Sequence, residues 1–312
     1  MRDYVGHLPD YTCRVTLERS TRRNARAPFE LSDRLRLEVA YTSGKELYSW
    51  PGNDRFEAGI EDLLRGHGMG SEGSYGLHIR NLFVRDVATF AEAQADRCEA
   101  RPCIRLGFDI PASRSGFYVS AGTTSAAAPL TGAAWFDPES LDILKLEVRV
   151  DETPRSVRIA ATRETTVYTR ARIGDVEFVL PASSELLLRD RNGTEARNHS
   201  TFDQYRRYSG TATVSYAPAD PGAPTPTVSP KQPPAFAGKD LTATLDTAID
   251  ATAAIGDPIA LTAKDGTHLT ARVTNMRRAG NRWLIDLAIS GLTRPSVQLP
   301  LNAGHTLVFR RE

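Results

Sequence analysis

The sequence predicts a mainly β protein of the α+β class, with a curved antiparallel half-barrel that carries two or so helices on its concave side and a small C-terminal β-barrel or sandwich domain. Three observations predict this fold. Long segments alternate apolar and polar residues with the period of two that a half-buried strand requires. One of these segments is too long to stay straight in a compact domain, and a proline-rich stretch divides the chain into two parts.

The clearest alternation runs from Gly132 to Leu186. Within it, the apolar residues of one strand occupy every second position, at Leu144, Leu146, Val148 and Val150. The segment 157–173 repeats the pattern, with one parity formed by Val157, Ile159, Ala161, Val167, Ala171 and Ile173 and the other by Arg158, Glu164, Arg170 and Arg172. Strands of this one-sided kind build an antiparallel sheet with one buried face.

The length of segment 157–173 predicts curvature. At roughly 3.3 Å per residue, a straight strand of this length spans about 55 Å, more than the roughly 45 Å diameter of a compact domain of this size. We therefore expect the strand to bend or break and the sheet to wrap partway into a barrel.

Two helices are predicted early in the chain, and we expect them to cover the open, apolar side of the sheet. Asp54 can cap a helix that runs through about Arg65. Its apolar residues at helical spacing are Phe56, Ile60, Leu63 and Leu64. A second short helix is predicted over His78 to Val84.

The other elements of the first domain are strands bounded by turn residues. Alternation predicts strands over 11–19, 33–41, about 88–97, 104–110 and 116–121. Ser43-Gly44 supplies a turn into the segment KELYSW, and Asn192-Gly193 predicts a type I′ hairpin.

A proline-rich segment separates two domains. Seven prolines lie between Pro218 and Pro234 with almost no large apolar residue among them, which predicts an extended linker. The predicted division is a half-barrel domain at 1–216, a linker at 217–238 and a small β-domain at 239–312. Turn pairs such as Asp265-Gly266 separate the alternating segments of that last domain.

The inward-facing residues of these strands and of the first helix are the candidate lining of a ligand cavity: Leu35, Leu37, Val39, Phe56, Ile60, Leu64, Leu144, Leu146, Val148 and Ile159. If the strand residues pack completely against the helix residues, no room remains for a ligand. The presence of a cavity therefore decides the function.

Composition excludes several classes of protein. The 312 residues include 39 basic and 38 acidic side chains, so the totals predict no nucleic-acid partner. No window approaches the roughly 20 apolar residues that cross a bilayer, so the chain is not expected to be transmembrane. The opening MRDYVGHLPDY lacks the basic and apolar segments of a leader.

The three cysteines leave two readings open. Cys98 and Cys103 enclose four residues, EARP, that could turn back on themselves and allow a local disulfide. Two cysteines that end one strand and start the next could equally remain free thiols. Cys13 shares the parity of Tyr11, Val15 and Leu17 and is predicted to be a small core residue.

No motif predicts catalysis, a metal or a cofactor. Gly68, Gly70 and Gly73 satisfy G-x-G-x-x-G, but a predicted helix precedes them where a phosphate loop needs a strand. The six histidines show no pair at ligand spacing and no companion cysteine pair. The chain has no Gly-x-Ser-x-Gly elbow, so we expect a protein that is not an enzyme.

The segment from Gly132 to Leu186 resembles bacterial lipoprotein carriers and sorting proteins of the LolA and LolB type. The resemblance lies in WFDP at Trp135 to Pro138, in the strand LDILKLEVRV, and in a Gly turn followed by a strand that ends in Leu-Pro, IGDVEFVLP. The opening LPDYTCRVTLER and the block GKELYSWPG are similar to exported bacterial proteins with this arrangement. The resemblance implies an incomplete barrel with a helical lid that binds acyl chains in its apolar concavity.

The functional expectation is a non-enzymatic extracytoplasmic protein, periplasmic or secreted, that binds an apolar or lipid-like ligand such as a lipoprotein acyl chain. Members of the resembling group carry a leader, so the expected form is one from which a leader has been removed. The alternative is a structural or interaction module of the cell envelope, with a solid half-barrel and envelope protein partners.

Overall fold

The structure is a computed structural model of the chain, and it describes residues 8–42, 44–53, 56, 82–83, 86–121, 124–208 and 240–311. The chain forms two compact units, Met1–Tyr208 and Ser209–Glu312. The predicted linker at 217–238 lies outside the described residues.

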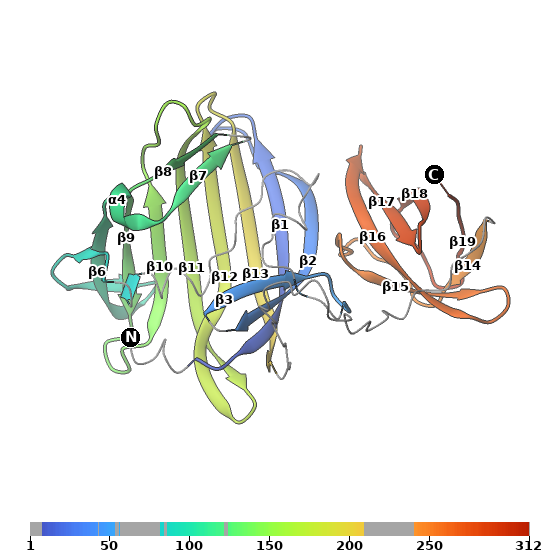
Figure 1. Ribbon diagram of the computed structural model, residues 1–312, viewed down its shortest axis with the longest axis horizontal. Helices are drawn as coiled ribbons and strands as arrows, with labels where there is room; N and C mark the ends of the chain where they lie inside the picture. Colours follow the sequence, from blue (N-terminus) through green and yellow to red (C-terminus); the bar gives the residue numbers. More distant parts are fainter. Residues whose placement is uncertain are drawn as a thin grey trace, which may run out of the picture. The chain divides into compact units, whose positions relative to one another are not determined.

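The first unit is built on one eleven-stranded antiparallel sheet. Its strands are β1 (Tyr11–Arg22), β2 (Glu30–Thr42), β3 (Lys45–Ser49), β4 (Thr89–Phe90), β5 (Gln94–Cys98), β6 (Arg101–Ile110), β9 (Leu130–Phe136), β10 (Ile143–Val150), β11 (Ile159–Ile173), β12 (Val176–Asp190) and β13 (Glu195–Arg207). They follow the order β3-β2-β1-β13-β12-β11-β10-β9-β6-β4, and β5 pairs with β6. The sheet is strongly curved (Figure 1), which confirms the predicted half-barrel.

The long strand β11 bends through irregular pairing with β12. The register shifts between Ile159 and Ala161 and again between Val167 and Tyr168. A bulge adds one residue to one strand of a pair, which bends the strand and changes which side chains face the core. The expectation that segment 157–173 cannot run straight is confirmed.

The predicted parity of this segment is wrong in its middle part. Glu164 and Tyr168 are buried, whereas Val167 is 42% exposed. The sequence pattern assumed a strict period of two, and the extra residue at the first bulge reverses the faces there. Beyond the second shift Ile173 is buried and Arg170 and Arg172 are exposed, as predicted.

Short elements pack against the concave side of the sheet. The hairpin of β7 (Tyr118–Ala121) and β8 (Thr124–Ala127) follows the helix α4 (Ala112–Ser115), and its Val119 is buried in the inner apolar cluster (Figure 1). Of the second predicted helix, Leu82 and Phe83 are described, and both are helical and buried. The rest of that helix lies outside the described residues, as does the first one except for Phe56, which is not helical.

No helix in the described ranges combines the length and apolarity needed to cross a bilayer.

The second unit is a closed six-stranded barrel. Its strands are β14 (Leu241–Leu245), β15 (Pro258–Ala263), β16 (His268–Ala279), β17 (Arg282–Ile289), β18 (Leu292–Gln298) and β19 (Thr306–Phe309), in the order β18-β17-β16-β15-β14-β19. Thr293 and Arg310 join the two end strands by reciprocal backbone hydrogen bonds of 2.7 and 2.8 Å. Fully buried side chains fill the interior: Leu245, Leu261, Ile285, Leu287, Leu307 and Phe309. The predicted small C-terminal β-barrel is confirmed.

Candidate functional site

The curvature of the large sheet brings distant strands together on its inner face. Tyr168 in β11 and Glu46 in β3 are five steps apart in the strand order. In a flat sheet, five steps of about 4.8 Å would separate them by about 24 Å. The Glu46 carboxylate instead lies close enough to help raise the pKa of the Tyr168 phenol, which is raised mainly by burial. This effect agrees with the strong curvature of the sheet in Figure 1, which gives the sheet a concave face.

An apolar cluster covers much of this face. Its buried members come from strands β6 to β13, and Leu82, Phe83 and Val119 pack on it from outside the sheet. The ring of Phe83 stacks on Phe90 at 5.7 Å and contacts the edge of Phe136 at 6.1 Å. Three residues of the predicted lining, Leu146, Val148 and Ile159, belong to this cluster.

Leu144 does not share this face, and its place in the predicted lining is wrong. It packs with Cys98, Cys103 and Trp135 in a separate cluster. The pairing of β10 with β9 shifts between Ile143 and Lys145, so Ile143 takes the inward position instead. The prediction assumed regular alternation across this position, where the structure has a bulge that sequence spacing does not reveal.

The predicted β2 residues lie on the concave face, beside inward residues of β1. Leu35, Leu37 and Val39 are buried, and they are directly opposite Leu17, Val15 and Cys13.

The helical part of the predicted lining is described at one residue. Phe56 is half-buried and meets the ring of Tyr208 edge-on at 6.1 Å. Ile60 and Leu64 lie outside the described residues.

A row of polar residues, buried except for the half-buried Asp33, crosses the apolar lining from β11 to β2. We call it the polar belt, and its members are Arg19, Asp33, Glu164, Thr166, Ser184, Asn198 and Ser200. They occupy the inward positions of their strands, because Tyr168, Leu186 and Ala196 of the inner cluster share their parity. Thr166, Ser184 and Ser200 are successive cross-strand partners, and so are Asn198, Arg19 and Asp33.

Hydrogen bonds hold both ends of the polar belt. The Arg19 guanidinium donates to Asp33 through Nε at 2.7 Å and through Nη2 at 2.5 Å. At the other end, the Ser184 hydroxyl donates to Glu164 Oε1 at 3.0 Å and accepts from Thr166 Oγ1 at 3.2 Å. Between these pairs, Arg19 Nη1 and Asn198 Nδ2 are buried without a hydrogen-bond partner. Two donors of the polar belt therefore have no acceptor, and the Tyr168 hydroxyl of the same face also lacks a partner.

Aromatic residues line the face on one side of the polar belt. Tyr11 stacks on Tyr41 with ring centres 5.3 Å apart and meets the edge of Tyr205 at 5.5 Å. The Tyr205 hydroxyl donates to the carbonyl oxygen of Pro181 at 2.6 Å. Burial raises the pKa of Tyr11, Tyr168 and Tyr205, so these phenols stay neutral. This part of the wall therefore combines neutral phenol rings with one buried carboxylate, that of Glu46, which accepts a hydrogen bond from the Tyr48 hydroxyl at 2.8 Å.

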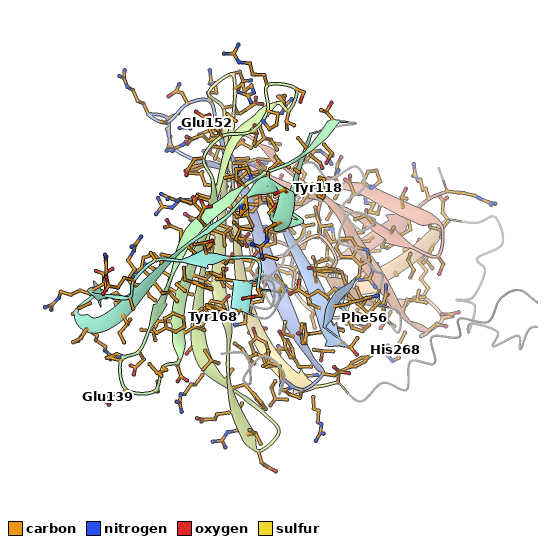
Figure 2. The ribbon with its side chains drawn as sticks, turned by 60° about the vertical axis from the view of Figure 1, so that its left-hand side comes forward. Phe56, Tyr118, Glu139, Glu152, Tyr168 and His268 are labelled. Carbon is orange, nitrogen blue, oxygen red and sulfur yellow. A yellow bond between two sulfur atoms is a disulfide. The ribbon has the colours of Figure 1, made fainter. Side chains whose placement is uncertain are left out.

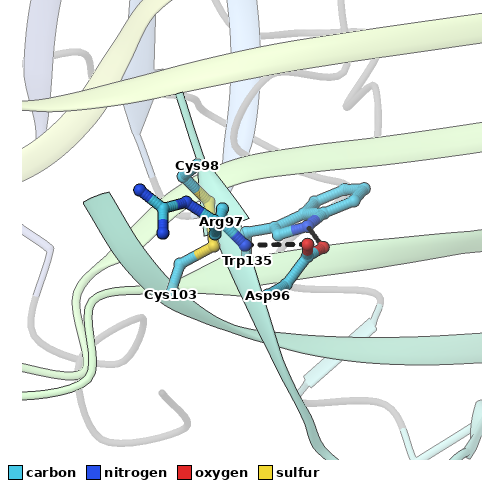
Figure 3. Close-up of a disulfide and its surroundings, with 5 residues drawn as sticks. All are labelled: Asp96, Arg97, Cys98, Cys103 and Trp135. Atoms are coloured by element: carbon cyan, nitrogen blue, oxygen red, sulfur yellow. Dashed lines mark hydrogen bonds between the residues drawn. A yellow bond between two sulfur atoms is a disulfide. The ribbon is translucent and has the colours of Figure 1, made fainter. Parts of the chain in front are cut away.

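The convex face carries charged pairs and a disulfide. Arg34 binds Glu18 at 2.6 Å on strands β2 and β1. Cys98 and Cys103 are joined across the β5–β6 hairpin beside Trp135, whose indole donates to Asp96 at 2.8 Å (Figure 3). This hydrogen bond lowers the pKa of Asp96. Of the two states left open by the sequence, the structure has the disulfide.

The described residues offer little to a catalytic mechanism. No three His, Cys, Asp or Glu side chains within them gather in a way that could hold a metal ion. The Cys13 thiol is free but buried, and burial raises its pKa far above the ordinary value. A thiol that stays protonated is a poor nucleophile.

Part of the polar belt carried a sequence signal that the prediction did not use. Arg19 continues the inward parity of Val15 and Leu17, and Asp33 continues that of Leu35 and Leu37. Two opposite charges on the apolar parity of neighbouring strands indicate a buried ion pair. Asn198 and Ser200 had no comparable signal, because the pairing of β13 with β1 and β12 places them there.

No family model and no curated protein matches this chain. Among solved structures, the chain is similar to the crystal structure of a LolA superfamily protein from Nitrosomonas europaea, at 11% identity and a TM-score of 0.28, over 65% of this chain and 89% of that one. At that level of similarity neither a ligand nor a site residue can be transferred to this chain.

Proposed function

We propose that the first unit is a non-enzymatic extracytoplasmic binding protein, which holds an apolar or lipid-like ligand such as an acyl chain against the concave face of its sheet. The observation that carries the proposal is the one-sided character of this strongly curved sheet. Its inner face gathers buried aliphatic and neutral aromatic side chains, and its outer face carries ion pairs such as Arg34–Glu18. Burial of an apolar chain is favourable in proportion to the apolar area removed from water.

The disulfide supports the extracytoplasmic part of the proposal. Cys98 and Cys103 are bonded. Such bonds persist in oxidising compartments and are rare where cellular thiols keep cysteines reduced. The pair therefore favours the periplasm or the exterior of the cell.

The first experiment asks whether the protein carries a lipid. The full chain is produced in the periplasm of a bacterial host, and native mass spectrometry is followed by organic extraction of the purified protein. We expect co-purifying lipid, and binding of a fluorescent acyl probe after the protein is stripped. A protein that carries no lipid and binds no probe contradicts the proposal and leaves the envelope interaction module as the remaining function.

A space-filling substitution separates a ligand site from a solid core. Ala196 is buried on the inner face of β13. In a filled core, Ala196→Phe would cost about 1–3 kcal/mol of stability through overpacking. In a ligand site the ring enters the space of the ligand, so we expect weaker probe binding with little loss of stability. Val167→Phe, at the exposed Val167 of β11, is the matched control and should leave probe binding unchanged.

A further inference from the structure

We propose that Arg19 and Asn198 bind the carbonyl oxygen of an ester or amide group in the ligand. The ligand of the concave face is then a neutral acylated amphiphile, and neither a bare hydrocarbon nor a free fatty acid. The inference rests on the proposed function, because it assumes that an apolar ligand occupies this face.

The two donors lie next to each other at the centre of the polar belt. Arg19 in β1 and Asn198 in β13 are directly opposite in an antiparallel pair. Residues placed in this way have Cβ atoms about 4.5–5.5 Å apart and point to the same side of the sheet. Both residues are 5% exposed, and Arg19 Nη1 and Asn198 Nδ2 have no acceptor. Two neighbouring residues on the same face of the sheet therefore each carry an open N–H group.

Open donors at this position need an explanation. Buried polar groups in folded proteins are almost always hydrogen-bonded, and an unsatisfied one costs its full desolvation penalty. The neighbouring belt residues are satisfied, since Arg19 also holds Asp33 and Ser184 bridges Thr166 and Glu164. An acceptor supplied by the ligand would complete the row.

The charges of the polar belt select a neutral acceptor. Its described residues include two carboxylates, Asp33 and Glu164, and one guanidinium, that of Arg19. Asp33 already takes two hydrogen bonds from this guanidinium, so a second anion would bring repulsion without a free counter-charge. A carbonyl oxygen has two lone pairs and no charge, and it can accept from both open donors.

The residues around the two donors suit the acyl part of the same molecule. Leu17 and Leu35 continue the inward rows of β1 and β2 beside the polar belt. Leu186 and Leu188 do the same in β12 and belong to the inner apolar cluster. A carbonyl bound between them would have apolar wall on both sides for its hydrocarbon chain.

Three probes of equal chain length test the proposal on the lipid-stripped full chain. Each is a pyrene-labelled acyl chain, and they end in a methyl ester, a carboxylate and a methyl group. We expect the ester to bind about 10-fold more tightly than the hydrocarbon, as one net hydrogen bond to a charged donor would give. We also expect the ester to bind more tightly than the carboxylate.

Asn198→Leu removes one donor while nearly keeping the shape of the side chain. It should weaken the preference for the ester, because only Arg19 then donates to the carbonyl oxygen, and leave the affinity for the hydrocarbon unchanged. Thr201→Val, at an exposed position on the opposite face of β13, is the matched control and should keep the preference. Arg19 is left intact because its removal would strand the buried carboxylate of Asp33.

The outcomes separate the two proposals. If none of the three probes binds, the proposed function fails. If all three bind equally, or the carboxylate binds most tightly, the function stands and the inference is overturned. An Asn198→Leu protein that loses stability when lipid-free but keeps the ester preference also overturns it, because Asn198 then bonds to Arg19 inside the protein. If this variant does not fold, the three probes on the unaltered chain decide.

Discussion

The two units differ in whether their antiparallel sheet closes on itself. Both are antiparallel sheets with one apolar face, but the six strands of the second unit close through Thr293 and Arg310, whereas the strand order of the first ends at β3 and β4. The small barrel is narrow enough for side chains such as Phe309 and Leu287 to fill it.

The interiors differ in chemistry as well as in size. Within the described residues, the buried side-chain polar atoms that lack a hydrogen-bond partner all belong to the first unit. In a sheet whose interior holds only its own side chains, a buried donor without an acceptor lowers stability and gains nothing in return. The comparison teaches that strand pattern alone does not show whether a sheet leaves buried polar groups without a partner.

Phe309→Ala in the second unit should have the largest effect. The side chain is fully buried in a filled barrel, so its removal leaves a cavity and should cost about 3–5 kcal/mol. Urea denaturation followed by the fluorescence of Trp283, which lies in β17, measures this loss. Val308→Ala, at the half-buried neighbour, should cost much less. Equal losses would show that the barrel interior is not closely packed.

Leu146→Ala in the first unit should cost less than an equivalent change in the barrel. Leu146 is buried in the inner cluster, and where a wall adjoins ligand space the cavity part of the penalty is smaller. We expect a loss of about 2–3 kcal/mol in the lipid-free protein, together with weaker binding of the acyl probe. Leu287→Ala in β17 is the barrel counterpart. If Leu146→Ala costs as much stability as Leu287→Ala and probe binding is unchanged, the first unit has a filled interior like that of the barrel.

Reduction of the disulfide should destabilise the first unit alone. Cys98 and Cys103 are five residues apart, and the entropy of closing so short a loop predicts a loss of about 2 kcal/mol. Hydrogen-exchange mass spectrometry with and without reductant should show faster exchange in β5 and β6. The second unit contains no cysteine and serves as the internal control. Unchanged exchange in β5 and β6 would mean that the pairing of this hairpin does not need the bond.

Acidification should break the hydrogen bond from Trp135 to Asp96 in the first unit, with a small effect on stability. The pKa of Asp96 is lowered, chiefly by the hydrogen bond from Trp135, so this bond contributes above the ordinary value of 3.8. It is lost as the pH falls through the lowered pKa. Indole fluorescence should therefore change below pH 3.8, and Asp96→Asn should remove this step. An identical acid transition in that variant would assign the change to another group.

The sequence predicted the parts of the fold that depend on period and on turn residues. The alternations in β1 and β2, the position of the hairpin at Asn192-Gly193 and the small second barrel follow from such local patterns. The predicted type I′ turn is wrong, because Gly193 has a positive φ and Asn192 does not. The bulge beside Ile159 and the shift at Ile143 could not be read in the same way. A bulge adds one residue to one strand, and whether it forms depends on the partner strand and the curvature of the sheet.

The same limit explains what was missed in the candidate site. Leu146, Val148 and Ile159 were placed correctly on the inner face by parity. Glu164 was assigned to the wrong face because it follows a bulge, and Asn198 was not singled out because a polar residue in a strand usually faces water. The polar belt is a property of five strands in register, and single strands do not show it.

The brevity of the two strands that end the large sheet has a further consequence. β3 has five residues and β4 has two, whereas their inner neighbours run for ten to thirteen. A long bare margin would offer a row of backbone groups to another molecule and invite polymerisation. Because β3 and β4 are short, they offer few unpaired backbone groups to a strand of a second copy. The protein should therefore resist fibre formation even when it is concentrated.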